Sequence, residues 1–243
     1  MSALERLRGG LVVSVQAEAT SPLNASDALA MLASVAVANG AAGVRAEGSA
    51  RIGAIRRAVG VPVIGLVKRA YRGFAPYITA TAREVAEAVA AGADIVAFDA
   101  TGRARPDGRS DEAVVRDIHA RGKLAMADCA APPDVARAAA AGADIVGTTM
   151  CGYTAETAGT PLPAIDLVRA CAASGSFAIA EGGVMSPDEV RAAFAAGAAC
   201  VVVGTAITNV DALVRRFAAA SRRATERVHP IEVVADGSQE RHR

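Results

Sequence analysis

The sequence has 243 residues, of which 52% are hydrophobic, so the chain is long and apolar enough to bury the core of one sizeable domain. Its 26 basic and 25 acidic residues leave a formal net charge of +1, with no block of like charge and only 3% aromatic residues. This balance excludes the basic footprint of a nucleic-acid-binding protein and the polybasic patch of a membrane-surface protein.

Four cysteines, Cys129, Cys151, Cys171 and Cys200, fit neither a disulfide framework nor Cys-x-x-Cys metal spacing in a chain of this length. We expect them to be reduced thiols. The first ten residues carry charges where a secretion signal needs an apolar core, and no small-residue cleavage site follows them. These features predict a cytoplasmic protein.

Two uncharged stretches, 28–44 and 192–210, approach the length of about 18 residues at which a membrane span is suspected. Each stretch breaks at an internal glycine, Gly40 or Gly197, into a helix followed by a strand. A helix that crosses a bilayer would not need such a break, so we expect neither stretch to span a membrane.

A short motif recurs along the chain, in which an alanine-rich segment is followed by a glycine and then by β-branched residues. Its glycines lie about 50 residues apart, roughly twice the length of one strand–helix unit: Gly40, Gly92, Gly142 and Gly197. In each copy we expect a helix to end at the glycine, in a left-handed cap, and a strand to begin just after it. Each interval should then hold two strand–helix units.

Apolar runs predict eight strands in chain order: 11–16, 43–45, 61–67, 94–99, 123–128, 144–149, 177–181 and 200–204. Helix start signals lie between them: Ser26-Asp27, Thr81, Ser110-Asp111, Pro132-Pro133-Asp134 and Ser186-Pro187-Asp188. Eight evenly spaced units of near-continuous apolar strands predict an α/β fold, a single (β/α)8 TIM barrel over 1–225. A doubly wound sheet is disfavoured because no Gly-x-Gly-x-x-Gly turn follows the first strand. Residues 226–243 lack periodicity and are expected to form a flexible tail.

In such a barrel the active site lies at the carboxyl ends of the strands. Polar residues end the apolar runs at these positions: Gln16, Arg45, Glu47, Lys68, Asp99, Asp128, Thr148, Thr149, Glu181, Gly204 and Thr205. Charges at so many strand ends are hard to explain as packing.

Lys68 and Glu181 are the candidate acid and base. Lys68, followed by Arg69, is either one of two solvated loop cations or a group in the barrel mouth, where desolvation and a nearby cation such as Arg45 would favour its neutral form. Glu181 either caps a backbone amide or acts as an acid, a base or a hydroxyl ligand.

Asp99 and Asp128 can be interpreted more simply than as functional groups: each would pair with a cation such as Arg45, Lys68 or Arg103.

Gly182-Gly183 and Gly204-Thr205 follow the seventh and eighth strands, where many barrels bind phosphate with backbone N–H groups. No histidine lies at a comparable position, since the chain has only His119, His229 and His242. We therefore expect no catalytic zinc and no activated cysteine, and we interpret Cys129 and Cys151 as small core or rim residues.

A series of short blocks, in order from residue 7 to about 217, carries a more specific signal. The blocks are Val13–Ala17, Gly43–Ala46, Pro62–Gly65 with Lys68-Arg69, Ile78–Thr81, Phe98–Thr101 with Arg103, Arg105 and Pro106, Met126–Asp128, Gly147–Thr149 with Gly152-Tyr153-Thr154, Ala180–Gly182 and Val203–Thr208. Together they resemble the N-acetylmannosamine-6-phosphate 2-epimerase family.

The resemblance implies cofactor-independent interconversion of N-acetylmannosamine 6-phosphate and N-acetylglucosamine 6-phosphate, in amino-sugar and sialic acid catabolism. By motif, Lys68 and Glu181 take the acid and base roles. Substrate contacts are expected from Gln16, Arg45, Asp128, Thr148 and Tyr153, and phosphate contacts from Gly182, Gly183, Gly204 and Thr205. A homodimer is expected from the general frequency of symmetric dimers.

Two positions depart from the family pattern. An arginine commonly follows the family's Glu-Gly pair and another follows its Ala-Ile-Thr segment, whereas this chain has Gly183 and Asn209. Three explanations remain open: backbone donors at Gly183 and Gly204 suffice, Arg215 or Arg216 substitutes, or the substrate differs from the family's.

Inversion at C2 requires removal of the proton α to the C1 aldehyde of the open-chain sugar and its return to the opposite face. Lys68 is the favoured C2 base. Two other functions remain open: a Schiff-base lyase or aldolase acting on a sugar phosphate through the Lys68 amine, and a non-catalytic barrel that binds a sugar phosphate as a sensor.

Overall fold

The computed structural model describes residues 1–226. Eight strands form a closed barrel in chain order, each parallel to its neighbours, with the last strand paired to the first. They are β1 (Leu11–Ser14), β2 (Gly43–Glu47), β3 (Val63–Leu66), β4 (Ile95–Asp99), β5 (Leu124–Asp128), β6 (Ile145–Gly147), β7 (Phe177–Glu181) and β8 (Cys200–Val203). The predicted (β/α)8 barrel is confirmed, and the predicted tail beyond Glu226 lies outside the described residues.

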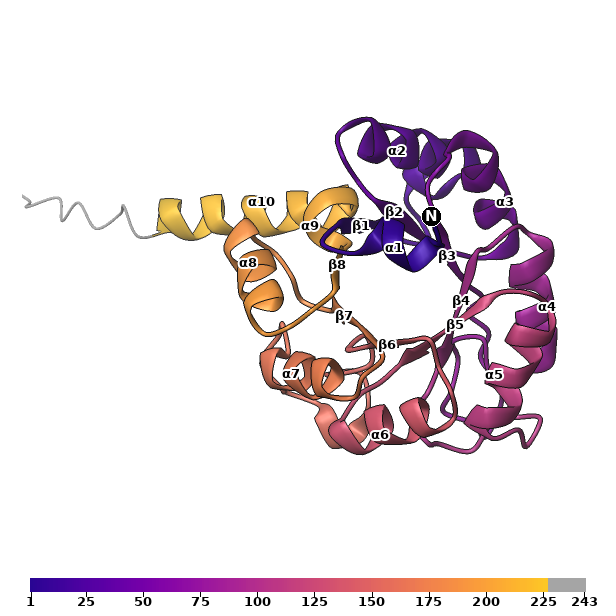
Figure 1. Ribbon diagram of the computed structural model, residues 1–243. Coiled ribbons are helices and arrows are strands. Elements are labelled where there is room, and N and C mark those ends of the chain that lie inside the picture. Colours follow the sequence, from indigo (N-terminus) through magenta and orange to yellow (C-terminus); the bar gives the residue numbers. More distant parts are fainter. Residues whose placement is uncertain (227–243) are drawn as a thin grey trace, which may run out of the picture.

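Helices form a ring around this barrel (Figure 1). They are α1 (Ala3–Leu7), α2 (Ser26–Ala38), α3 (Ser49–Ala58), α4 (Ala82–Ala90), α5 (Asp111–Ala120), α6 (Pro132–Ala140), α7 (Ile165–Ala173), α8 (Pro187–Ala195), α9 (Thr205–Thr208) and α10 (Val210–Glu226), with 3-10 turns η1 (Pro22–Asn24) and η2 (Ala155–Thr157). The last helix, α10, projects away from the ring (Figure 1). The amino-terminal helix α1 was not expected from the sequence.

The helix start signals in the sequence act as expected. Thr81, Ser110 and Ser186 are the N-cap residues of α4, α5 and α8, where their hydroxyl groups accept backbone N–H groups that have no partner within the helix. The helix α6 begins at Pro132, and its Asp134 carboxylate accepts two backbone N–H groups ahead of the helix. Local chemistry therefore fixes where these helices start.

The four repeat glycines all have positive φ angles, between +83° at Gly142 and +101° at Gly197. In every copy the helix ends two residues before the glycine and the strand begins three residues after it. The left-handed backbone at the glycine turns the chain from the helix into the strand without a steric penalty. The repeat thus sets half of the helix-to-strand connections of the barrel.

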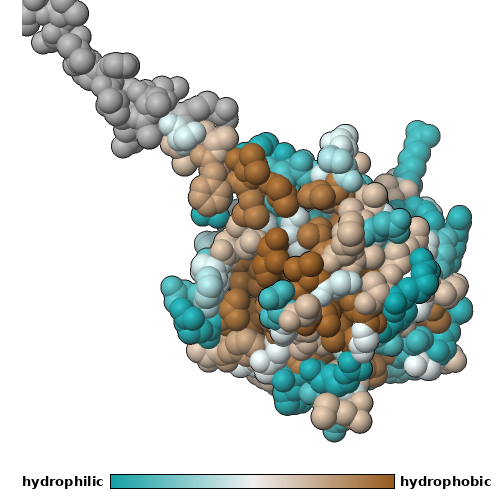
Figure 2. Space-filling view, turned by 90° about the horizontal axis from the view of Figure 1, so that it is seen from above, coloured by the Kyte–Doolittle hydropathy of each residue, from teal (hydrophilic) through white to brown (hydrophobic). Residues whose placement is uncertain are grey.

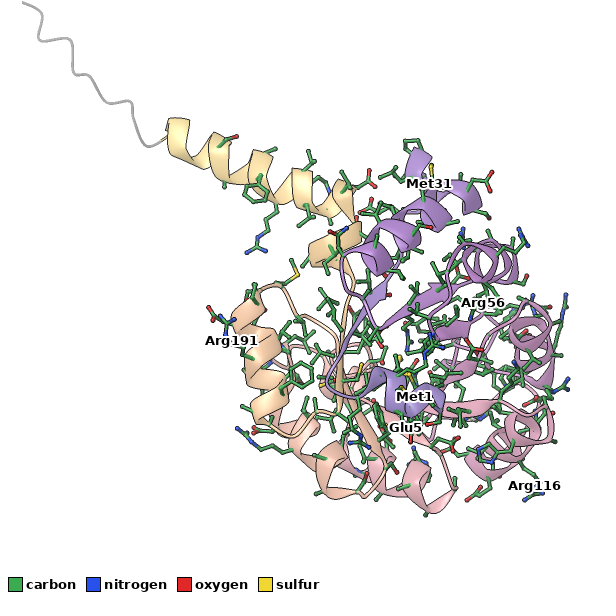
Figure 3. All side chains as sticks on the ribbon, turned by 45° about the horizontal axis from the view of Figure 1, so that its top comes forward. Met1, Glu5, Met31, Arg56, Arg116 and Arg191 are labelled. Atoms are coloured by element: carbon green, nitrogen blue, oxygen red, sulfur yellow. The ribbon has the colours of Figure 1, made fainter. Side chains whose placement is uncertain are left out.

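Side chains on the strands point alternately into the barrel and toward the helices, which divides the hydrophobic core into two layers. Residues of one parity pack together inside the barrel: Val12, Ile64, Leu66, Ile95, Ala97, Met126, Ile145, Phe177, Ile179, Cys200 and Val202. Their neighbours of the other parity pack between the strands and the helices, as Val146 and Ala178 do. At the amino ends of the strands the buried Leu7 of α1 joins the inner layer, and Figure 3 shows Met1 and Glu5 over the middle of the ring.

The two uncharged stretches fall on separate elements, as expected: 28–44 covers most of α2 and the start of β2. Over residues 1–226, no helix combines the length and the apolar character that crossing a membrane requires.

Candidate active site

A cavity of about 350 Å³ opens at the carboxyl ends of the strands. Most of the polar residues proposed from the sequence line it: Gln16, Arg45, Glu47, Lys68, Thr149, Tyr153, Glu181, Gly182, Gly183, Gly204 and Thr205. They come from six of the eight strands, yet the closed barrel brings their ends to one place. The inner parity of each strand, continued past its end, points most of these residues toward the barrel axis, whereas Gly182 and Thr205 have the other parity.

Arg45 on β2 is the centre of the charged group in this cavity. Its guanidinium binds Asp128 of β5 through two hydrogen bonds, Nη2 to Oδ2 at 2.7 Å and Nη1 to Oδ1 at 3.2 Å. The same Nη1 lies 3.0 Å from Oε2 of Glu181 on β7. Burial disfavours the Arg45 cation, but the charges of Asp128 and Glu181 outweigh this effect and raise its pKa above the ordinary value. Arg45 therefore stays charged and holds both carboxyl groups.

The carboxyl group of Glu181 has a pKa close to neutral pH. Burial of its carboxyl group raises its pKa from the ordinary value of 4.5 to about 7, since the desolvation cost and the nearby Asp128 outweigh Arg45, Thr149 and Lys68, which favour the ionised form. A carboxyl group with a pKa near 7 can both give and take a proton at neutral pH.

Lys68 lies just after β3, and its backbone is held by a short antiparallel bridge to Ile78. The bridge includes hydrogen bonds from Arg69 N to Tyr77 O at 2.9 Å and from Thr79 N to Val67 O at 2.8 Å. The Lys68 side chain lines the cavity but is exposed. Lys68 therefore stands at the open rim of the cavity.

Two of the proposed substrate contacts do not line the cavity. Thr148 is buried with the outer parity of β6, and its hydroxyl donates to Glu181 O at 2.7 Å and accepts Glu181 N–H at 3.0 Å. It therefore fixes the backbone of Glu181, and its side chain does not line this cavity. The sequence signal that separates it from Thr149 is the period of two along the strand.

Asp128 is also fully buried. It pairs with Arg45, as the simpler interpretation of this residue predicted. Asp99 likewise pairs with a cation, Arg103, at 2.7 Å. Sequence reasoning did not single out Tyr77, which lines the cavity and whose pKa is raised by burial and by the Asp99 charge.

The four cysteines are buried free thiols, as expected. Burial raises the pKa of Cys129 and Cys151 above the ordinary value, which disfavours the reactive thiolate. Over residues 1–226, no three His, Cys, Asp or Glu side chains are grouped so that they could hold a metal ion.

Comparison with known proteins agrees with this arrangement. Residues 29–223 match the family described as "Putative N-acetylmannosamine-6-phosphate epimerase". A relative from Thermosynechococcus vestitus, named "Putative N-acetylmannosamine-6-phosphate 2-epimerase", is 44% identical over 228 residues, which cover 93% of this chain and 99% of the relative. The chain belongs to this epimerase family. A relative of the same name from an Enterobacter species is 42% identical and covers 89% of this chain and 94% of its own length.

A solved structure, described as the N-acetylmannosamine-6-phosphate 2-epimerase from Clostridium perfringens, superposes with a TM-score of 0.87 at 34% identity. The alignment covers 90% of this chain and 96% of that one. The family and the barrel are thus shared over nearly the whole described chain.

The first departure from the family pattern, Gly183, lies in a backbone conformation that favours glycine. Its φ is +71°, and a Cβ atom placed there would lie 2.2 Å from Cβ of Leu162. An arginine at this position would require both a left-handed backbone and a shift of Leu162. Glycine is therefore the residue that this loop accommodates.

The second departure, Asn209, has a structural role. Its side-chain Oδ1 accepts the backbone N–H of Ala212 at 3.0 Å, so it caps the start of α10. Neither Arg215 nor Arg216 lines the cavity, and Arg215 pairs with Glu18, with Nη1 3.0 Å from Oε2. Neither of the two arginines proposed as substitutes therefore lines the cavity.

Proposed function

We propose that the chain is a cofactor-independent 2-epimerase that interconverts N-acetylmannosamine 6-phosphate and N-acetylglucosamine 6-phosphate. One observation carries this proposal: an amine, Lys68, and a carboxyl group of near-neutral pKa, Glu181, line one cavity in a chain whose relatives are named for this reaction. Both groups stand at strand ends, where (β/α)8 enzymes perform their chemistry.

Lys68 removes the C2 proton of the open-chain sugar and holds it as an ammonium group beside the enolate that forms. The enolate then accepts a proton on its opposite face. Glu181 supplies or relays protons, either on that face or through a sugar hydroxyl. Arg45 keeps Glu181 in place and adds a fixed positive charge near the developing negative charge.

Substrate contacts fall into two groups. Gln16, Tyr153 and the guanidinium of Arg45 line the cavity and contact the sugar directly. Asp128 and Thr148 act indirectly, since Asp128 orients Arg45 and Thr148 fixes the Glu181 backbone.

The phosphate binds to backbone groups at the ends of β7 and β8. Within residues 1–226, the backbone N–H groups of Gly182, Gly183 and Gly204 donate to no backbone or side-chain acceptor, so all three remain available. Gln16 supports the same region, because its Nε2 donates to Thr205 Oγ1 at 3.4 Å. A dianion bound by several N–H donors needs no side-chain cation.

We expect the 6-phosphorylated sugar to be strongly preferred over free N-acetylmannosamine, because the free sugar leaves these donors unfilled. Steady-state kinetics with both sugars would measure this preference as a ratio of kcat/KM. Comparable values would contradict a phosphate site and indicate a non-phosphorylated substrate.

The decisive experiment is an NMR assay of N-acetylmannosamine 6-phosphate with the purified protein in heavy water, with a chelator and without nicotinamide. We expect both C2 epimers to form, with solvent deuterium at C2. Turnover that retains hydrogen at C2 would rule out exchange through these acid and base groups. Binding without turnover would favour the sensor function.

A Schiff-base lyase or aldolase is the second candidate, favoured by the exposure of the Lys68 amine. Borohydride reduction during turnover would trap such an imine on the protein. The result is easy to read, since Lys68 and Lys123 are the only lysines in the sequence. An epimerase that works by proton transfer gives no adduct.

We also propose that this reaction takes place in the cytoplasm, in amino-sugar and sialic acid breakdown, and that the chain forms a homodimer. Large apolar side chains lie exposed on α2, α9 and α10: Met31, Val35, Ile207, Val210, Val214 and Phe217. Figure 2 shows a hydrophobic surface that continues onto α10, and Figure 3 shows Met31 on the outer side of α2. A second copy would cover this surface.

A further inference from the structure

The hydroxyl group of Thr149 lies between two carboxyl groups of the site. Its Oγ1 is 2.8 Å from Oδ1 of Asp128 and 3.1 Å from Oε2 of Glu181. The Nη1 of Arg45 contacts the same two oxygen atoms, at 3.2 Å and 3.0 Å. Thr149 and Arg45 therefore bridge Asp128 and Glu181 from two sides.

The two bridges differ in what they can donate. The guanidinium has several N–H groups and can satisfy both carboxylates at once. A hydroxyl group has one proton, so Thr149 can donate to Asp128 or to Glu181 but not to both. If both carboxyl groups are ionised, one of them lacks the Thr149 hydrogen bond.

Protonation of Glu181 removes this conflict. A proton on Oε2 of Glu181 can be donated to Oγ1 of Thr149, and Thr149 then donates its own proton to Oδ1 of Asp128. In this arrangement every one of these oxygen atoms has a partner. When Glu181 loses its proton, rotation of the Thr149 hydroxyl lets it donate to the new carboxylate.

We propose that Thr149 is a positioning residue for Glu181, whose hydroxyl group turns between Glu181 and Asp128 as Glu181 gains and loses a proton. This inference rests on the proposed acid/base role of Glu181. The bridge gives each protonation state a satisfied hydrogen bond and holds the carboxyl group in one place through the catalytic cycle.

Charged and titratable groups face Glu181 from several elements. Arg45 comes from β2, Lys68 follows β3, and Asp128 ends β5. Burial and the negative charge of Glu181 both raise the pKa of the Cys200 thiol on β8. Arg45, Lys68 and Asp128 are unchanged by a substitution at Thr149, so the variant isolates the contribution of the hydroxyl group.

Thr149→Val removes the hydroxyl with little change in volume, and a hydrogen bond to a charged group is stronger than one to a neutral group. The ionised form of Glu181 therefore loses more than the neutral form, and its pKa should rise. We expect the limb of the pH–rate profile that reports Glu181 to move upward by about one pH unit. Thr149→Ser, which restores the hydroxyl, should return the limb to the wild-type position.

The matched control is Thr101→Val. The Thr101 hydroxyl donates to Oδ1 of Asp99 at 2.6 Å, so this variant removes a threonine–aspartate hydrogen bond at the same end of the barrel without touching Glu181. Its Glu181 limb should stay at the wild-type pH. A drop in rate for Thr149→Val at every pH, with no displacement of the limb, would overturn the proposal.

A second measurement does not depend on activity. Titration of the Glu181 carboxyl group by NMR, in protein labelled with 13C-glutamate and assigned with Glu181→Gln, should show the same upward movement in Thr149→Val. If the wild type shows no epimerase turnover but this titration moves, the proposed function fails and the bridge stands. If the wild type turns over and the titration does not move, the bridge fails.

Discussion

Lys68 and Lys123 provide a natural pair for testing the C2 base. Lys68 lines the cavity at the carboxyl ends of the strands, whereas Lys123 precedes β5 at the opposite end of the barrel. Because Lys68 is exposed, its replacement removes no buried packing.

We therefore expect Lys68→Met to fold normally and to lose turnover by about 10²–10⁴-fold, the usual effect of removing a positioned general base. Lys123→Met is the control and should retain wild-type kcat. Circular dichroism and thermal unfolding would verify the fold of both. A near-normal kcat in Lys68→Met would refute the assignment of the C2 base.

The proposed role of Glu181 links activity to the pH dependence of stability. Its pKa is about 7 in the folded protein, above its ordinary value of 4.5, so folding favours the protonated form. The stability that this group contributes is present below about pH 4.5 and is lost as the pH rises through 7.

Glu181→Gln should abolish most turnover and should also escape this loss of stability. Denaturant unfolding at pH 5 and pH 8 should show the variant gaining about 2–3 kcal/mol relative to the wild type between the two pH values. Stability curves that run parallel across this range would indicate that Glu181 ionises in the folded protein as easily as in the unfolded chain.

At the scale of single elements, the loop after β7 is closed to a larger side chain. Gly183→Ala places a Cβ against Leu162 in a left-handed backbone, which should lower the free energy of unfolding by about 1–3 kcal/mol. Gly60→Ala is the control, since a Cβ there meets no atom within 4 Å and the φ angle is not left-handed. Equal melting temperatures for the two variants would show that the loop adapts freely.

The start of α10 makes a similar prediction for the second departure from the family. Asn209→Arg removes the side-chain cap of α10 and should cost about 1 kcal/mol of stability, whereas Asn209→Asp should keep the cap. If the new arginine also reaches the phosphate, KM for the phosphorylated sugar falls with little change in kcat. Unchanged stability together with unchanged KM would contradict both roles.

At the level of the whole molecule, the proposed dimer depends on the projecting helix α10. The exposed positions Val210, Val214 and Phe217 recur at helical spacing and form one apolar face. We expect the wild type to sediment as a dimer and Val214→Asp/Phe217→Asp as a monomer. Arg216→Asp, on another side of the helix, should remain a dimer. A monomeric wild type at micromolar concentration would refute the proposed assembly.

The barrel can be predicted from local features of the sequence. The four-copy glycine motif, the cap residues Thr81, Ser110 and Ser186, and the apolar strands all act through neighbours along the chain, so their signals are local and readable. The predicted barrel also indicated the strand ends as the candidate site, because all parallel strands end on one side of a closed barrel.

The arrangement of the candidate site residues, in contrast, depends on contacts between strands that are distant in the sequence. Thr148 and Thr149 are adjacent and chemically alike, yet barrel closure turns one toward the Glu181 backbone and the other into the cavity. The burial of Asp128, the exposure of Lys68 and the pKa of Glu181 depend on side chains brought together from β2, β5 and β7. Desolvation and charge pairing act through space, between residues up to 136 positions apart in the case of Arg45 and Glu181, and no local pattern of sequence records them.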